Sequence, residues 1–287
     1  MPRYCGREWS DEDLDRIRDL LEREAQASRM RLSRLLCELF DWRALNGTLK
    51  EMSARVAMLA MHRDGLIELP PPRRARPGSY RLIPTPESDP QPLWRGSVSD
   101  LKALAIVPVE PGVPLRRWNE FVGRYHYLGY QMLAGAQMRY FIMDGERLLG
   151  ALGFGAAAWK VAPRDRFIGW SPAEREQGLQ RIVGQSRFLI LPWIRCRNLA
   201  SKTLAMVARR LGEDWEARYG FRPALLETFV DTMRFHGTCY RAANWLQIGH
   251  TQGRGRLDRD HQYSQPVKSI WLKPLVQDFR RQLKAPS

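Results

Sequence analysis

A basic turn between an apolar run and a long helical pattern is the first place where residue types and spacing could do chemistry. The run 188–191 is typical of a strand and ends at Pro192, which cannot donate to a sheet ladder, and the helical pattern covers 199–219. A strand that turns directly into a helix presents backbone N–H groups and the positive end of the helix dipole to an anion. We therefore predict a phosphate-binding turn made of Arg195, Cys196, Arg197, Asn198, Ala200, Ser201 and Lys202. The phosphates could belong to a coenzyme or to a nucleic-acid backbone, and the alternative is a solvated, basic helix start.

A second group of polar residues surrounds the end of the apolar run 225–230. Asp231 follows this run, and His236 and Tyr240 come within the next ten residues. A carboxylate or imidazole here could take a proton from an amine, and Tyr240 could donate one to a leaving group. Glu227, inside the run, is a further candidate base. The alternatives are that Asp231 caps a turn, His236 is exposed, Tyr240 packs in the core and Glu227 is a paired surface residue.

The charge of the chain favours nucleic acid as a partner. The 287 residues carry 46 Lys and Arg against 31 Asp and Glu, a net charge of +15, and 101–287 holds 29 of the bases and 15 of the acids. A basic surface of this size attracts phosphate polymers, although an arginine-rich composition in general is the alternative. Four scattered cysteines without a CxxC pair and five histidines without ligand spacing lead us to expect no metal. No apolar run is long enough to span a membrane, and the scattered cysteines indicate a reducing compartment, so we expect a cytoplasmic protein.

Three places offer side chains for a nucleic acid. Tyr125, His126 and Tyr127 could stack on an unpaired base, because aromatic faces beside arginine suit single strands. Glycines next to Arg254 and Arg256 would let that loop approach phosphates, with Lys268 beyond it. In the N-terminal part, the candidates are Lys50, Arg73, Arg74 and Arg76. Core packing of the aromatic cluster and a plain surface loop are the alternatives.

The N-terminal part, 1–84, predicts a winged helix-turn-helix. Helical spacing covers 10–24, 31–40 and 48–63, and two short strand patterns follow at 66–69 and 80–83. In the third helix we expect Lys50 on the DNA-facing side. The opposite face is expected to pack in the core, and it carries Leu49, Met52, Val56 and Leu59. A protein-interaction module is the alternative to DNA binding. The Pro- and Ser-rich segment 85–100 predicts a linker.

The second domain, 101–287, predicts an α+β fold with a mixed sheet flanked by helices. A hairpin turns at Asp144-Gly145, and a strand–turn–helix, a strand, a short helix and a strand follow. This order resembles the GCN5-related N-acetyltransferase fold. Pro192, Arg195 and Ala200 match that family's pyrophosphate loop, whereas Asn198 stands where the family prefers Gly.

The resemblance to the acetyltransferases has two implications. It implies acetyl-CoA or another acyl-CoA as cofactor, and it places Tyr240 at the position of the family's general acid, with Asn244 again in place of Gly. Asn tolerates a left-handed backbone better than most residues, so both turns could still close. We then expect neighbouring strands to separate around Arg195 and Tyr240, leaving an electropositive cleft.

Nearly the whole chain also resembles the DruA family of the Druantia anti-phage defence systems. The motifs that carry this are Tyr127-Leu128-Gly129, Gly150-Ala-Leu-Gly153-Phe154, Asn198-Leu-Ala-Ser201-Lys202, Leu226-Glu227-Thr-Phe-Val-Asp231 and Gly237-Thr-Cys-Tyr240-Arg241-Ala-Ala-Asn244-Trp245. The resemblance implies defence or mobile-element biology, with double- or single-stranded DNA and defence-system or transposase proteins as partners.

Two hypotheses follow. The protein is either an acyltransferase acting on an amine of a nucleobase or protein, or a non-catalytic DNA-recognition subunit that has lost its cofactor.

Overall fold

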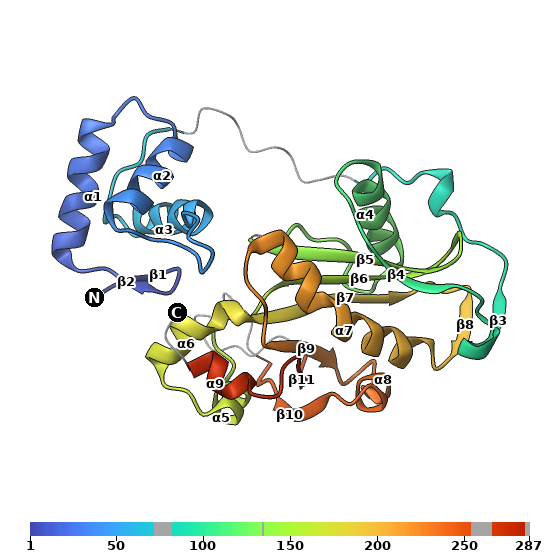
Figure 1. Ribbon diagram of the computed structural model, residues 1–287. Helices are drawn as coiled ribbons and strands as arrows, with labels where there is room; N and C mark the ends of the chain where they lie inside the picture. Colours follow the sequence, from blue (N-terminus) through green and yellow to red (C-terminus); the bar gives the residue numbers. More distant parts are fainter. Residues whose placement is uncertain (72–81, 134, 254–265, 285–287) are drawn as a thin grey trace. The chain divides into compact units, whose positions relative to one another are not determined.

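The chain folds into two compact units, Met1–Arg81 and Leu82–Ser287, each with its own core. The computed structural model describes residues 1–71, 82–133, 135–253 and 266–284 (Figure 1). Five residues predicted to bind nucleic acid lie outside these ranges: Arg73, Arg74, Arg76, Arg254 and Arg256.

The first unit contains the three predicted helices. These are α1 (Asp11–Arg23), α2 (Arg29–Leu39) and α3 (Glu51–Arg63), preceded by a two-stranded sheet of β1 (Arg3–Tyr4) and β2 (Arg7–Glu8). Ser10 caps α1, since its side chain accepts from the backbone of Asp13 while the Asp13 carboxylate accepts from Ser10. The core of the unit includes Trp9, Ile17, Leu32, Leu36 and Met61.

Two details of the winged-helix prediction are wrong. The buried face of α3 carries Ala54, Met58 and Met61, whereas Met52 and Val56 are each 48% exposed. Both faces are apolar at helical spacing, and packing selected the one whose alanines allow close approach to α2. In addition, 66–69 forms no strand, and most of the second expected strand lies outside the described residues, so the wing is not shown. Lys50, at the N-terminal cap of α3, is half-buried, and burial lowers the pKa of its amine.

The second unit is built on a seven-stranded mixed sheet with the order β10-β11-β9-β7-β6-β5-β4. Its strands are β4 (Leu104–Pro108), β5 (Gln137–Asp144), β6 (Arg147–Ala156), β7 (Ile182–Ile190), β9 (Leu225–Asp231), β10 (Leu246–His250) and β11 (Lys268–Pro274). Only β7 and β9 pair in parallel, and all other neighbours in this sheet are antiparallel. The predicted hairpin, strand–turn–helix, strand, short helix and strand occur in the expected order.

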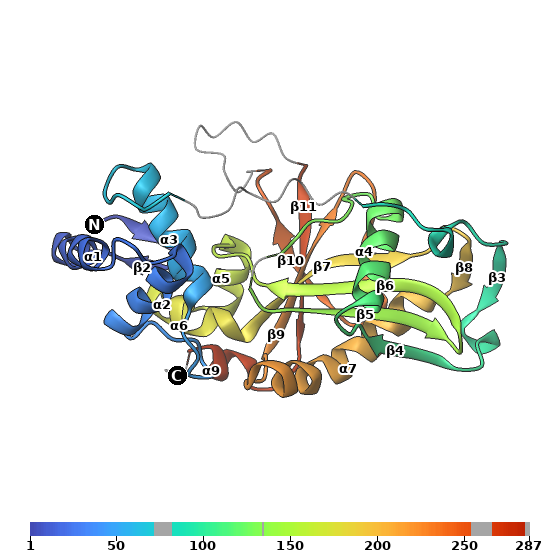
Figure 2. The same cartoon turned by 90° about the horizontal axis from the view of Figure 1, so that it is seen from above.

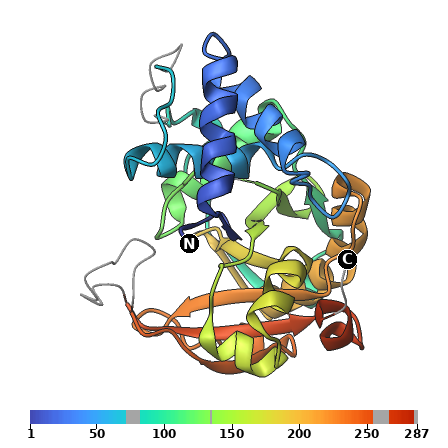
Figure 3. The ribbon, with the colours of Figure 1, turned by 90° about the vertical axis from the view of Figure 1, so that its left-hand side faces the viewer.

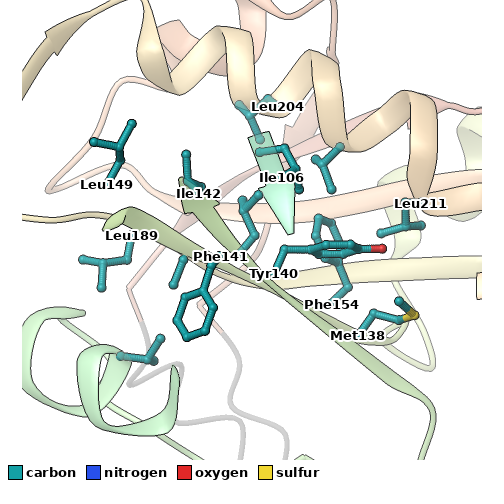
Figure 4. Packing of buried hydrophobic residues seen from close by; sticks show 14 of the residues in the cluster. Ile106, Met138, Tyr140, Phe141, Ile142, Leu149, Phe154, Leu189, Leu204 and Leu211 are labelled. Atoms are coloured by element: carbon teal, nitrogen blue, oxygen red, sulfur yellow. The ribbon is translucent and has the colours of Figure 1, made fainter. Parts of the chain in front are cut away.

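Helices cover both faces of this sheet. α4 (Val113–Tyr125) and α7 (Leu199–Tyr219) lie on opposite faces (Figures 1 and 2). On the α7 face, Tyr140 and Ile142 pack with Leu204 and Leu211 (Figure 4). The remaining helices are α5 (Ala162–Ile168), α6 (Pro172–Gly178), α8 (Thr238–Ala242) and α9 (Phe279–Lys284). α5, α6 and α9 gather near the β10–β11 end of the sheet, where they bury a smaller apolar cluster (Figure 3).

The predicted linker 85–100 is instead part of the second unit. It contains two short 3-10 helices, Pro86–Ser88 and Val98–Asp100, and the strand β3 (Trp94–Ser97), which pairs in parallel with β8 (Ile194–Arg197). Elsewhere in the second unit, a third 3-10 helix spans Leu179–Arg181, between α6 and β7. Ser88 is buried and donates to the Glu120 carboxylate of α4, so the segment is fastened to the domain although its composition is that of a linker. Among the described residues, no helix is long and apolar enough to cross a bilayer.

Candidate nucleic-acid interface

The strands β7 and β9 separate as predicted. They pair only over Ile182–Gln185 and Leu225–Thr228. Beyond this point β7 continues along β6 to Ile190, while β9 continues along β11 to Asp231. An irregularity in register at Ser186, opposite Gly153 and Phe154, coincides with the point of separation.

Aromatic side chains fill the space between the separating strands. Tyr240 is 7% exposed, and its hydroxyl donates to Oε1 of Gln185 at 3.0 Å. The rings of Phe188, Trp245 and Trp271 surround it at centroid distances of 6.3, 5.2 and 6.0 Å. Burial raises the pKa of Tyr240, so the hydroxyl is a poor acid. The structure therefore makes Tyr240 a core residue and contradicts the prediction of an open cleft beside it.

The turn before α7 has the backbone that the sequence predicts. Asn198 has a φ of 63° and Asn244 a φ of 58°, so both asparagines adopt the left-handed conformation expected where the resemblance has glycine. The side chains of Arg195, Arg197 and Lys202 are exposed around this turn. Basic side chains and a helix N-terminus thus come together as predicted.

Other features of the turn work against a phosphate-bearing cofactor. β8 pairs with β3, which places Arg195 opposite Arg95 and Cys196 opposite Gly96 and commits part of this backbone to a sheet. Burial, followed by the charges of Asp100 and Asp144, raises the pKa of Cys196. Two carboxylates thus lie near the turn, Ser201 donates its hydroxyl to the Asn198 carbonyl, and the Ala200 carbonyl accepts from Thr203. These contacts and carboxylates weaken the fit of the turn to the pyrophosphate of an acyl-CoA.

The predicted acid–base residues do not form one site. Asp231 is buried; Oδ1 accepts from the backbone of Met233 at 3.0 Å, and Oδ2 lies 3.6 Å from Nε of Arg234. It therefore caps the turn after β9. His236 is exposed, and no hydrogen bond among the described residues joins two of Asp231, His236 and Tyr240.

Glu227 has a structural role. Its Oε1 accepts from the backbone of Ala158 at 2.7 Å, and its Oε2 lies 2.8 Å from NH1 of Arg164. Both side chains are fully buried, so this carboxylate cannot reach a nucleophile and does not serve as a base. The described residues contain no group of three or more His, Cys, Asp or Glu side chains placed to hold a metal ion.

An exposed aromatic surface, here called the Tyr127 platform, consists of His126, Tyr127, Arg234 and Phe235. Tyr127 is 39% exposed and Phe235 49% exposed, and their ring centroids are 5.6 Å apart. The Arg234 guanidinium lies 5.2 Å from the Tyr127 ring, and His126 stacks on the same ring at 4.9 Å. The structure thus brings the predicted pair 126–127 together with two residues from the turn after β9.

Two other predicted residues do not belong to this platform. Tyr125 donates its hydroxyl to the Ser88 carbonyl and packs edge-on against Trp193, so it is a core residue. Lys268 is the half-buried first residue of β11, and its backbone N–H donates to Thr251.

Sequence reasoning missed Arg187, which lies in β7 beneath the platform. Its Nε donates to the Gly129 carbonyl at 2.8 Å and its NH1 to the Ser186 carbonyl at 2.7 Å. Burial and the Arg187 charge lower the pKa of His126 to about 4, so this imidazole is neutral at pH 7. The backbone of Leu128 donates to His126 Nδ1, which leaves the proton on Nε2. An arginine directly before the apolar run 188–190 of a predicted strand is the signal that could have found this residue.

Comparison with known proteins identifies the family of the chain. Residues 61–263 match the family described as Druantia protein DruA. Because the match covers more than half of the sequence, the chain belongs to the DruA family. Comparison with curated proteins gave no match.

Several solved structures are similar to this protein over part of its fold. An acetyltransferase from Bacillus subtilis in complex with CoA has 8% identity and a TM-score of 0.39, covering 60% of this chain and 99% of its own. FeeM, an N-acyl amino acid synthase from uncultured soil microbes, has 14% identity, a TM-score of 0.35 and coverage of 62% and 94%. An aminoglycoside acetyltransferase in complex with coenzyme A and kanamycin has 14% identity, a TM-score of 0.30 and coverage of 48% and 66%, so that less than two thirds of it is spanned. These are partial similarities of fold and say nothing of ligands or activity in this chain.

Proposed function

We propose that this member of the DruA family binds single-stranded nucleic acid through the Tyr127 platform and works without an acyl cofactor, as a DNA-recognition subunit of a defence system. The observation that carries the proposal is the exposure of the Tyr127 and Phe235 rings beside Arg234. Large aromatic faces left in solvent beside a guanidinium are the usual surface on which unpaired bases stack.

The charge of the second unit supports the same function. Nearly all of the net charge of +15 falls in 101–287, and many of its arginines are exposed. Such a surface draws a polyanion toward the platform and makes the affinity fall steeply with salt. Contact of the first unit with duplex DNA through Lys50, Arg73, Arg74 and Arg76 stays a prediction.

Titration of a fluorescently labelled oligothymidylate, read by anisotropy, tests this function. Each stacked base contributes about 1–3 kcal/mol, so we expect the double variant Tyr127→Ala/Phe235→Ala to bind at least about tenfold more weakly. The salt dependence should stay as in the wild type, because no basic residue is lost. Trp159→Ala is the matched control, since Trp159 is also 39% exposed. Equal affinity of the wild type and the double variant would exclude the platform as the binding surface.

A second function, acyl transfer, is favoured by two observations. The strands β7 and β9 separate, and the turn before α7 is basic and left-handed at Asn198. Because Phe188, Tyr240 and Trp245 fill the gap, we expect calorimetry with acetyl-CoA to show no saturable heat. Saturable binding that is lost in Arg195→Ala would replace our proposal with a transferase.

A further inference from the structure

Arg187 is a buried cation without a carboxylate partner in the part of the chain that the structure describes. The described residues contain three buried arginines: Arg164, Arg175 and Arg187. The first two form ion pairs with Glu227 and Asp165. Arg187 is 9% exposed, yet no carboxylate among the described residues lies within 4.0 Å of it. Since buried charges are normally paired, this exception needs a physical reason.

Arg187 lines a narrow recess on the α4 side of the sheet, together with Trp118 of α4. Arg139 from β5 borders the same recess and also has no carboxylate partner among the described residues; its NH2 donates to Oε1 of Gln137 at 2.6 Å. The Trp118 ring lies 5.1 Å from the Arg139 guanidinium, and Gly153 forms part of the wall. A Cβ at Gly153 would lie 2.9 Å from the Trp118 ring and 3.3 Å from Arg187 Cβ, so the recess depends on that glycine. Two basic residues thus line one small space, and no acidic side chain of the described residues lines it.

The size of the recess limits what can enter it. Its volume is about 10 Å³, room for one water-sized group, such as a single oxygen of an oxyanion. Only two of the five N–H groups of Arg187 donate to described residues, both to carbonyls, so the others are available to a ligand. Burial lowers the pKa of both Arg139 and Arg187, which means that an incoming negative charge would stabilise both.

The recess and the Tyr127 platform are adjacent. Arg187 Nε holds the carbonyl of Gly129, two residues beyond Tyr127, and the same guanidinium acts electrostatically on the His126 and Tyr127 side chains. A base on the platform would therefore place its own phosphate near Arg187. An internal phosphodiester is flanked by sugars on both sides, whereas a terminal phosphate projects three oxygens and can insert one of them into a narrow space.

We propose that the recess formed by Arg139 and Arg187 binds the terminal phosphate of a nucleic-acid strand whose end base stacks on the Tyr127 platform. The proposal rests on the proposed function and narrows it to strand ends that carry a phosphate. A competing explanation makes Arg187 only a clamp for the loop 126–130, through its bonds to the Gly129 and Ser186 carbonyls. That explanation assigns no role to Arg139 and predicts no preference among strand ends.

Oligothymidylates of equal length with a 5′-phosphate, a 3′-phosphate or hydroxyl ends, labelled internally, separate these explanations by anisotropy. Hydrogen bonds between charged partners contribute about 1.5–3 kcal/mol, so we expect one phosphorylated end to bind about 10- to 100-fold more tightly than the hydroxyl-ended strand. Arg187→Gln and Arg139→Gln should each reduce that ratio to nearly one while changing the affinity for the hydroxyl-ended strand much less. Arg209→Gln, which removes an exposed arginine from α7, should leave the ratio unchanged.

Equal binding of all three strands by the wild type would overturn the proposal, as would a ratio that survives both substitutions. Should Arg187→Gln fail to fold, Arg139→Gln carries the test, because Arg139 is only partly buried. Strand binding that depends on Tyr127 without any preference for a phosphate would leave the proposed function intact and remove only this inference. If no strand binds, inorganic phosphate alone tests the recess: a rise in Tm that is absent in Arg139→Gln supports it, and no rise overturns it.

Discussion

Two buried arginines of the second unit, Arg164 in α5 and Arg187 in β7, are held in opposite ways. Arg164 of α5 is fully buried and bonds to Glu227 at 2.8 Å and to Asp165 at 2.9 Å, and Arg175 also pairs with Asp165, at 3.5 Å. Arg187 of β7 is almost as deeply buried, but within the described ranges its side chain bonds only to backbone carbonyls. Arg164 is therefore a structural charge, whereas the charge of Arg187 is available to a ligand.

The paired region fastens the chain after β6 to the sheet. Glu227 accepts from the backbone of Ala158, and Arg164 donates to the carbonyl of the same residue. Every charge in this network therefore has a partner of opposite sign or a backbone dipole. The Arg187 region shows the reverse, since Arg139 and Arg187 face the same recess and His126 next to them is kept neutral. A bound anion would therefore stabilise the Arg187 region more than the paired region.

The largest expected effect is on stability, in the paired region. Arg164→Met leaves Glu227 as an unpaired buried carboxylate, so we expect a loss of about 3–5 kcal/mol in the free energy of unfolding. Urea denaturation followed by circular dichroism measures it. The double variant Arg164→Met/Glu227→Leu should recover much of the loss, because it removes both charges. A loss below about 1 kcal/mol in the single variant would show that the pairing is not structural and would erase the contrast with Arg187.

A smaller effect is expected from pH at the unpaired region. The pKa of His126 is about 4 in the folded chain, below its ordinary value of 6.5, so the unfolded chain binds the proton more tightly. The neutral imidazole therefore makes its full contribution to the free energy of unfolding above pH 6.5, and this contribution is lost as the pH falls from 6.5 to 4. Because the side chain is partly exposed, we expect the loss to be about 1–2 kcal/mol.

The difference in unfolding free energy between the wild type and His126→Gln, measured from pH 7 to 4.5, isolates this group from others that titrate. The difference should shrink or reverse as the pH falls. In the presence of phosphate we expect the imidazole pKa, followed by NMR, to rise, since a bound anion offsets the Arg187 charge. A difference that does not change with pH would mean that neither burial nor the Arg187 charge lowers the pKa of His126.

Local structure was predictable from the sequence where the backbone alone decides it. The left-handed conformations of Asn198 and Asn244 follow from the intrinsic tolerance of asparagine. The three N-terminal helices, the hairpin at Asp144-Gly145 and the order of elements in the second unit follow from periodicity and turn chemistry.

The sites could not be predicted in the same way, because they depend on contacts between distant segments. Tyr240 has the spacing of a catalytic acid, and only its packing against Phe188, Trp245 and Trp271 shows that it is part of the core. The segment 85–100 has the composition of a linker, yet the pairing of β3 with β8 makes it part of the fold. The isolation of Arg187 from carboxylates is likewise a property of three-dimensional neighbours that no local pattern contains.

The smallest expected effect is that of Arg187→Met on the free energy of unfolding, and it tests most directly whether Arg187 and Arg164 differ in role. Arg187→Met removes a desolvated charge, which favours folding, and two hydrogen bonds to carbonyls, which opposes it, so we expect the free energy of unfolding to change by less than about 1 kcal/mol. The same substitution at Arg164 costs several times as much, although that side chain differs little in burial. Inorganic phosphate should raise the Tm of the wild type and leave Arg187→Met unchanged, because the anion has lost its partner. A loss in Arg187→Met as large as in Arg164→Met would mean that the carbonyls of Gly129 and Ser186 are sufficient partners, and the two arginines would then be architectural alike.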